Sequence, residues 1–129
     1  MHSFIYKVTL EEYLRGKNHE VLKPEIKLNI KMLLFRINYI RGLCNMPFII
    51  TSGLRTPEEQ HKINPKAVKS NHLIGAAIDI SDLNGDIYLW CRANESILVD
   101  VGLWGEIQQG NWVHLQIYNP KSGNRWFQP

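Results

Sequence analysis

The sequence predicts an α+β fold in which helices pack on one side of a small, mainly antiparallel sheet. The first observation is a long amphipathic helix between residues 24 and 44. The second is a set of short, β-branched apolar segments that follow it at intervals. The third is the pairing of the last two segments, 103–107 and 112–118, which only the turn Gln-Gln-Gly-Asn separates, as in a hairpin.

Capping signals place two short helices. Thr9 and Glu12 have the spacing of a capping box, so a short helix is expected there and should end near Gly16. Thr56 and Glu59 repeat that spacing, and the intervening Pro57 suits the first helical position. The second short helix should run to about residue 63.

The long helix begins at Pro24, where the missing N–H costs nothing. Its apolar residues recur at steps of three and four and form one stripe: Ile26, Ile30, Leu33, Ile37, Ile40 and Cys44. A further helix is expected to start at the turn Asn84-Gly85-Asp86 and to continue as one element through Leu98.

Four strands are expected, at residues 46–52, 76–81, 103–107 and 112–118. Residues 64–71 are expected to form a polar loop, and the closing PKSGNRWFQP an irregular tail. No Pro-rich or Ser-rich linker interrupts the 129 residues, so one domain over 1–129 is expected.

Composition is that of an ordinary globular protein, with 44% apolar and 21% charged residues and a net charge of +3. No Lys/Arg run exceeds two residues, which disfavours a nucleic-acid-binding domain. No apolar stretch reaches the roughly 20 residues of a membrane span, and the N-terminus does not resemble a secretory signal. We therefore expect synthesis in the cytoplasm, a monomer, and reduced thiols at Cys44 and Cys91.

His114 lies on the polar face of its predicted strand. The apolar face, which must point into the core, is formed by Val113, Leu115 and Ile117. The other face carries His114 with Trp112, Gln116 and Tyr118. The His114 side chain is therefore expected to point into a groove or into solvent.

Asp79 repeats this arrangement in the strand at 76–81. It shares the less apolar face with Ala77 and Ser81, and an acid in such a strand is costly to bury without a partner. His72 precedes it by seven residues, which a straight strand would extend over roughly 23 Å. Gly75 permits the bend that would bring the two together.

Two histidines and one carboxylate, with a fourth position left for water, form a typical catalytic zinc set. The spacing alone also permits a plainer interpretation. His114 is then an ordinary groove or surface histidine, and Asp79 caps a helix or pairs with a lysine.

Three segments resemble a known family. Residues 70–79, SNHLIGAAID, fit the pattern S-x-H-x-x-G-x-A-x-D at every fixed position. This pattern is similar to that of the zinc D-Ala-D-Ala carboxypeptidases and L-alanyl-D-glutamate endopeptidases. That family includes small phage endolysins and shares its fold with the Hedgehog signalling domain. Residues 51–56 resemble its S-G-x-R-[ST] segment, residues 112–114 its W-V-H segment, and the tail resembles phage-encoded members.

The resemblance implies that His72, Asp79 and His114 hold Zn²⁺. It further implies that Arg55 binds a carboxylate or carbonyl of the substrate, as suits the guanidinium fork, and that Trp112 lies at the substrate site. Arg55 could instead be a surface residue near the helix cap. Ser70 either hydrogen-bonds near the site or caps a turn.

One position departs from the family's pattern. The catalytic carboxylate commonly stands three residues before the last histidine, where this chain has Asn111, which cannot act as a base. Some members carry a glutamate farther upstream at the start of a hairpin, and Glu106 stands there. Glu106 is therefore predicted to be the general base. The alternative is an exposed hairpin residue beside a catalytically inactive site.

The implied function is zinc-dependent hydrolysis of peptidoglycan stem peptides, as in a phage-type lysin that acts on the wall after release or as part of a virion. The rival is a non-catalytic, zinc-stabilised module that binds the wall or a virion partner, and Asn111 motivates it. A basic nucleic-acid-binding domain is the weakest alternative.

Overall fold

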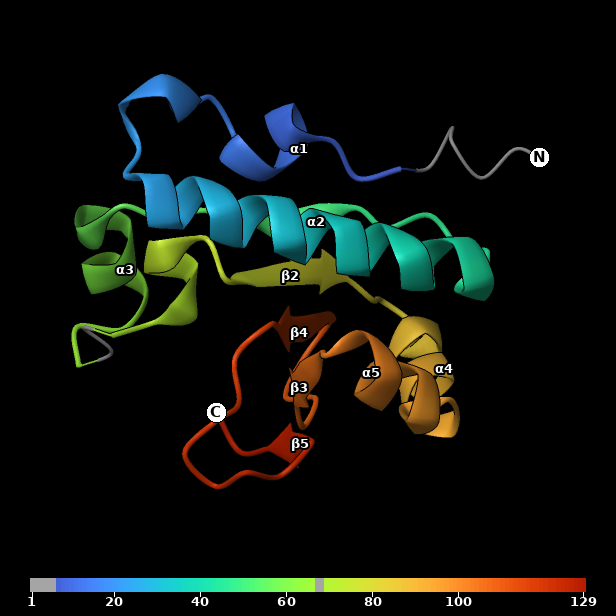
Figure 1. The fold of residues 1–129 in the computed structure, drawn as a ribbon. Helices are drawn as coiled ribbons and strands as arrows, with labels where there is room; N and C mark the ends of the chain where they lie inside the picture. The colour runs from blue at the N-terminus through green and yellow to red at the C-terminus, as the bar shows by residue number, and fades with distance from the viewer. Residues whose placement is uncertain (1–6, 67–68) are drawn as a thin grey trace.

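The computed structural model describes residues 7–66 and 69–129 (Figure 1). Its α-helices are α1 (Leu10–Leu14), α2 (Pro24–Cys44), α3 (Pro57–Ile63), α4 (Asp86–Ala93) and α5 (Glu95–Val101). Two short 3-10 helices are η2 (His19–Val21) and η3 (Asn71–Ile74). The strands are β1 (Ile50–Ser52), β2 (Ala77–Ser81), β3 (Trp104–Glu106), β4 (Trp112–Gln116) and β5 (Trp126–Phe127).

The strands form one sheet in the order β1-β2-β4-β3-β5. The three pairs β1/β2, β2/β4 and β3/β4 are antiparallel, and only β3/β5 is parallel. The predicted α+β class with a mainly antiparallel sheet is therefore confirmed.

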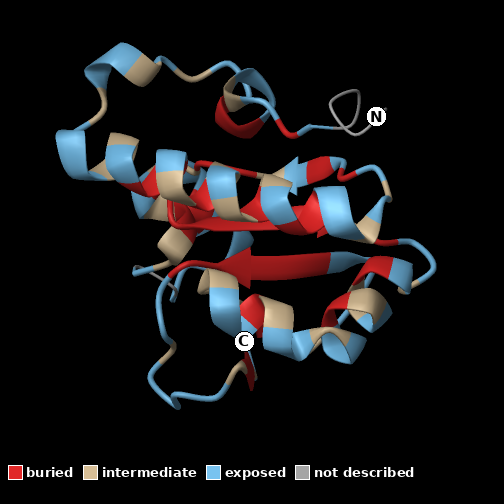
Figure 2. Ribbon diagram, turned by 45° about the vertical axis from the view of Figure 1, so that its right-hand side comes forward, coloured by how far each residue is buried: buried red, intermediate tan, exposed pale blue. Residues whose placement is uncertain are grey.

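The core lies between one face of this sheet and the helices. Figures 1 and 2 show α2 running along β2, with its buried positions turned toward the strands. The buried side chains of α2 include the predicted stripe: Ile30, Leu33, Ile37 and Ile40. Helices α4 and α5 add Ile87, Cys91 and Leu98 to the same cluster. With one face filled in this way, the polar side chains of the central strands lie on the other.

The capping signals predicted the short helices correctly. Thr9 and Thr56 are the N-caps of α1 and α3, and both form complete capping boxes. Pro57 occupies the first turn of α3, and α2 extends from Pro24 to Cys44 as expected. These signals succeed because each depends on atoms within one turn of the chain.

The single helix expected over 84–98 is wrong, because the chain breaks at Asn94. The Asn94 side-chain amide donates to the Trp90 carbonyl at 2.8 Å, and its backbone, at φ −116° and ψ 37°, ends α4. The Ile97 N–H then donates to the Asn94 carbonyl as α5 begins. An asparagine that satisfies a helix end in this way competes with continued helix.

The strands are shorter than the expected segments. Residues 46–49 lie outside β1, where Pro47 has no N–H for a strand ladder. The tail, expected to be irregular, contains β5. This element was missed because its two residues are too few for any periodicity, and their partner strand β3 lies about 20 positions earlier.

Cys44 and Cys91 are both free thiols, as predicted, and burial raises the pKa of Cys91 to about 12. Within the described ranges, no helix combines the length and apolarity that crossing a bilayer requires.

Candidate metal centre and active site

One row of side chains crosses the polar face of the sheet. The strand register aligns Ser52 with Asp79, and Asp79 with His114. The hairpin continues the row from His114 to Glu106, whose carboxylate Oε2 lies 3.8 Å from His114 Nε2. Phe127 follows, since it pairs with Glu106 in the parallel β3/β5 ladder. The row therefore draws one residue from each of the five strands.

His72 reaches this row from the 3-10 helix η3. The Ser70 hydroxyl accepts from the His72 N–H at 3.2 Å and so caps η3. Gly75 ends η3 with φ +73°, and a Cβ there would lie 2.6 Å from the Ile30 side chain. A non-glycine residue would be both strained and crowded at this position. The bend expected at Gly75 is thus confirmed, and it turns the chain from His72 back toward Asp79.

Gly53 fixes the His72 ring at Nδ1, the ring nitrogen that does not face Asp79. Its carbonyl lies 2.8 Å from His72 Nδ1. A Cβ on Gly53 would stand 2.0 Å from the Tyr13 carbonyl, so the close approach of α1 to β1 requires glycine. The Tyr13 hydroxyl donates in turn to the Ala77 carbonyl at 2.8 Å, which ties α1 to the strand that carries Asp79.

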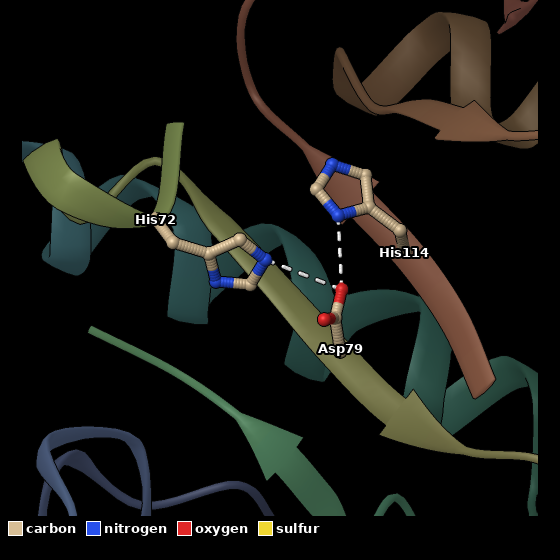
Figure 3. A group of neighbouring side chains, drawn as sticks. All are labelled: His72, Asp79 and His114. Atoms are coloured by element: carbon tan, nitrogen blue, oxygen red, sulfur yellow. Dashed lines mark hydrogen bonds and ion pairs between the residues drawn. The ribbon is translucent and has the colours of Figure 1, made fainter. Parts of the chain in front are cut away.

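The two histidines converge on Asp79 (Figure 3). His72 Nε2 lies 3.3 Å and His114 Nδ1 2.9 Å from Asp79 Oδ1, and one ligand atom from each residue fits within 4.8 Å of the others. Ligands about 2.1 Å from a tetrahedral zinc stand about 3.4 Å apart. The three side chains are also buried, so the arrangement has the size and enclosure of a metal site.

The outer nitrogens of both rings have acceptors, which sets their tautomers. A carbonyl only accepts, so His72 Nδ1 carries the hydrogen toward Gly53. Gln116 donates through Nε2 to the Tyr118 carbonyl at 2.8 Å, which leaves its Oε1, 2.8 Å from His114 Nε2, to accept. Metal-bound histidines typically donate their other N–H in this way.

The hydrogen bonds around His72, His114 and Asp79 are compatible with a bound cation and are unfavourable without one. In the neutral rings the lone pairs of His72 Nε2 and His114 Nδ1 both face the Asp79 carboxylate. The negative partial charges of the two nitrogens then repel the carboxylate oxygen. A metal ion or a proton relieves that repulsion. Burial alone would raise the pKa of Asp79, but the hydrogen bonds and charges of His114 and His72 hold it well below its usual range. Conversely, burial alone would lower the pKa of His114, but the hydrogen bond and charge of Asp79 raise it above its ordinary value.

Arg55 secures the other oxygen of Asp79. Its Nη2 donates to Asp79 Oδ2 at 3.0 Å, while Nε donates to Ser52 Oγ and Nη1 to Gln60 Oε1, each at 2.8 Å. Asp79 therefore pairs with an arginine and two histidines, and the lysine or helix-cap partner considered from the sequence is absent from its described contacts. Three of the five guanidinium N–H groups thus donate to partners within residues 7–66 and 69–129, and the other two donate to none of these residues.

Glu106 borders the centre on the side away from Arg55. Its side chain is 22% exposed, against 2% for His72 and 8% for His114. Burial raises the pKa of Glu106 above its ordinary value, chiefly through the loss of hydration around the charged form. Asn111, at the position usual for the carboxylate, is exposed at the start of the β4 hairpin arm, and its carbonyl accepts from the Asp82 N–H.

The family model described as Peptidase M15 matches residues 9–116. The chain belongs to the Peptidase M15 family. A search of curated proteins and a search of solved structures each returned no match. Peptidases of the M15 family are zinc-dependent, and in this member His72, Asp79 and His114 are the residues that fit the ion.

In this M15 chain His114 lies on the polar face of its strand, as predicted. Of the two surroundings considered for it, a groove or solvent, solvent does not apply, because the residue is only 7% exposed. Trp112, on the same face at the start of β4, is 40% exposed and packs over Gly110. Ser70 lies beside His72 as its helix cap. The substrate roles of Trp112, Ser70 and Arg55 stay predictions.

Several supporting residues of the M15 site were not predicted from the sequence. Gln116 was assigned to the face of His114, but its bond to the ring was not foreseen, although alternation along the strand already placed it two residues away. Ser52 and Gln60 orient Arg55, but only their closeness to it in the sequence could have indicated this role. No sequence pattern pointed to Phe127, because its neighbours in the site come from the distant strands β3 and β4.

Proposed function

We propose that this M15 peptidase hydrolyses amide bonds in peptidoglycan stem peptides, as an endopeptidase or a D,D-carboxypeptidase, and that it acts as a monomeric, phage-type wall lysin. The observation that supports hydrolysis is the row that sets Glu106 beside the convergent atoms of His72, Asp79 and His114. The family match supports the peptide substrate, and the resemblance of the tail to phage-encoded chains motivates the lysin role.

The bound Zn²⁺ would supply a Lewis acid that polarises the scissile carbonyl and makes water more acidic. The chain's own residues do the rest. Glu106 accepts a proton at its carboxylate as the water oxygen attacks the carbonyl carbon. It then returns the proton to the amide nitrogen as the C–N bond breaks, so the carboxylate is regenerated.

The remaining residues orient these groups. Gly53 and Gln116 fix the two imidazoles through their outer nitrogens. Arg55 fixes Asp79, and its two unoccupied N–H groups are available to a substrate carbonyl or carboxylate. Ser70 and Trp112 are assigned to the substrate side of the site on the family resemblance. Preorganisation of this kind lets the dipoles act without rearrangement during the reaction.

Mass spectrometry of fragments released from purified bacterial sacculi tests the proposal. Zinc-loaded protein is expected to release peptides with new ends, whose masses identify the bond. His72→Ala should release none, whereas His61→Ala, an exposed histidine on α3, should match the wild type. No release from sacculi of several wall chemotypes, with zinc bound at one equivalent, would contradict hydrolysis.

The alternative function is a zinc-stabilised module that binds wall peptide or a virion partner without cleaving it. The replacement of the usual carboxylate by Asn111 is the observation that favours it. The two functions differ in a measurable way. A binder retains affinity for sacculi and shows no change when Glu106 is replaced by glutamine, whereas a hydrolase loses turnover.

A further inference from the structure

Phe127 belongs to the row of the metal centre although it comes from the chain's last three residues. It pairs with Glu106 in the β3/β5 ladder, and its ring lies edge-on to His114, with centroids 6.2 Å apart and planes at 89°. The residue as a whole is half-buried. The family match ends at residue 116, so this wall of the site is built by a segment outside the matched region.

Phe127 is held in place by its neighbours. Trp126 points to the opposite face and donates through Nε1 to Glu95 at 2.9 Å. It fills the space over Gly105, where a Cβ would stand 2.3 Å from the Trp126 ring. The Ile107 N–H donates to the Phe127 carbonyl at 2.8 Å. These contacts make β5 a fixed strand, and the Phe127 ring is therefore presented at a defined place.

The Phe127 ring offers no hydrogen-bond donor to a carboxylate, and its ladder partner Glu106 is itself an acid. The neighbouring basic residue, Arg125, stacks its guanidinium 4.2 Å from the centre of the Trp104 ring and donates to the Leu103 carbonyl at 2.8 Å. The guanidinium keeps its charge, but these contacts direct it toward Trp104, in the next row of the sheet. A carboxylate seated against Phe127 would lose hydration without a charged partner at the ring, which is costly.

We propose that Phe127 contacts the side chain of the leaving-group residue and selects substrates in which that side chain is apolar over those in which it is acidic. This rests on the proposed function. Glu106 returns its proton to the leaving amine, so the residue that carries the amine lies on the Glu106 side. The next side chain along the row is Phe127.

Two synthetic peptides test this inference. They share the acyl-side sequence found in the sacculus experiment and differ only in the leaving residue, which is alanine in one and glutamate of the same configuration in the other. The measured quantity is the ratio of kcat/KM for the two peptides in the zinc-loaded protein. This ratio does not depend on the folded fraction of a variant, because both rates come from the same preparation.

The wild type is expected to prefer the alanine peptide. Phe127→Ala should reduce that preference about tenfold, the usual discrimination of an apolar contact of this size, and Phe127→Leu should largely retain it. Phe35→Ala removes a 75% exposed ring on α2 and should leave the ratio unchanged. A wild-type preference for glutamate, or an unchanged ratio in Phe127→Ala, overturns the inference while hydrolysis stands. Cleavage of neither peptide and of no sacculus overturns the proposed function together with it.

Discussion

The two halves of the site differ in how firmly they are held. In the ligand half, formed by Arg55, His72, Asp79 and His114, each side chain bonds to at least two partners, and exposure does not exceed 12%. In the edge half, formed by Glu106 and Phe127, Glu106 is 22% exposed, and 3.8 Å separates it from His114. A metal centre needs fixed ligands, whereas a substrate needs an accessible face. We therefore expect binding of the ion and turnover to depend on separate halves of the site.

Asp79→Asn should have the largest effect, because it removes a charged ligand and leaves Arg55 without its anionic partner. We expect loss of zinc, measured as metal content after gel filtration, and loss of hydrolysis. The metal-free protein should be destabilised by about 3 kcal/mol in urea unfolding, as when one member of a buried ion pair is removed. Asp100→Asn, an exposed carboxylate on α5, is the control. Full zinc occupancy in Asp79→Asn would contradict the assigned ligands.

Glu106→Gln should separate the halves. Zinc content should remain at the wild-type value, while kcat falls about a hundredfold to ten-thousandfold, the usual contribution of general acid–base catalysis. Adding Asn111→Asp to this variant should not restore activity, because residue 111 is exposed on the turn. Restoration by that second change would instead assign the base to position 111.

Gln116→Leu should act within the ligand half but less strongly. It removes the acceptor of the His114 Nε2–H, and the loss of such a partner typically weakens metal affinity about 10- to 100-fold. Competition with a chromophoric zinc chelator measures the change. Gln109→Leu, in the exposed hairpin turn, should match the wild type. Equal affinities in the two variants would show that Gln116 does not support the ligand.

The smallest expected effect is the position of the acidic limb in the pH profile of kcat/KM. A general base must be ionised, and burial raises the pKa of Glu106, so activity should fall as the pH drops through that raised value. The fall is therefore expected at a higher pH than for an ordinary glutamate, near 4.3. In Glu106→Gln this limb should be absent from the residual activity. A limb unchanged in that variant belongs to another group.

The sequence predicted the members of the candidate metal cluster better than the residues that support them. His72, Asp79 and His114 lie in segments whose local pattern is distinctive, and alternation along the strands assigned Asp79 and His114 to one face. Which atoms hold the outer nitrogens could not be predicted. Gly53 becomes the partner of His72 Nδ1 only when β1 pairs with β2. Gln116 lies on the face of His114, but its oxygen accepts from the ring only because the Tyr118 carbonyl takes the Gln116 amide N–H.

The elements show the same division. Capping boxes at Thr9 and Thr56 and the stripe of α2 depend on contacts within a few residues, so their helices were predicted from sequence. The break at Asn94 depends on which of two hydrogen-bonding arrangements the packed chain selects. Strand β5 forms where the Trp126 ring packs over Gly105, which has no side chain. No pattern within the tail predicts that contact.

The sequence by itself thus determined the fold class, the order of most elements and the set of residues able to hold zinc, because spacing and alternation are local properties of the chain. Only the tertiary structure decided that Asp79, His114, Glu106 and Phe127 share one row, because strand register is set by the packing of whole faces. The tertiary structure also decided which groups the Arg55 guanidinium binds. A guanidinium that binds Ser52, Gln60 and Asp79 together needs all three elements in place.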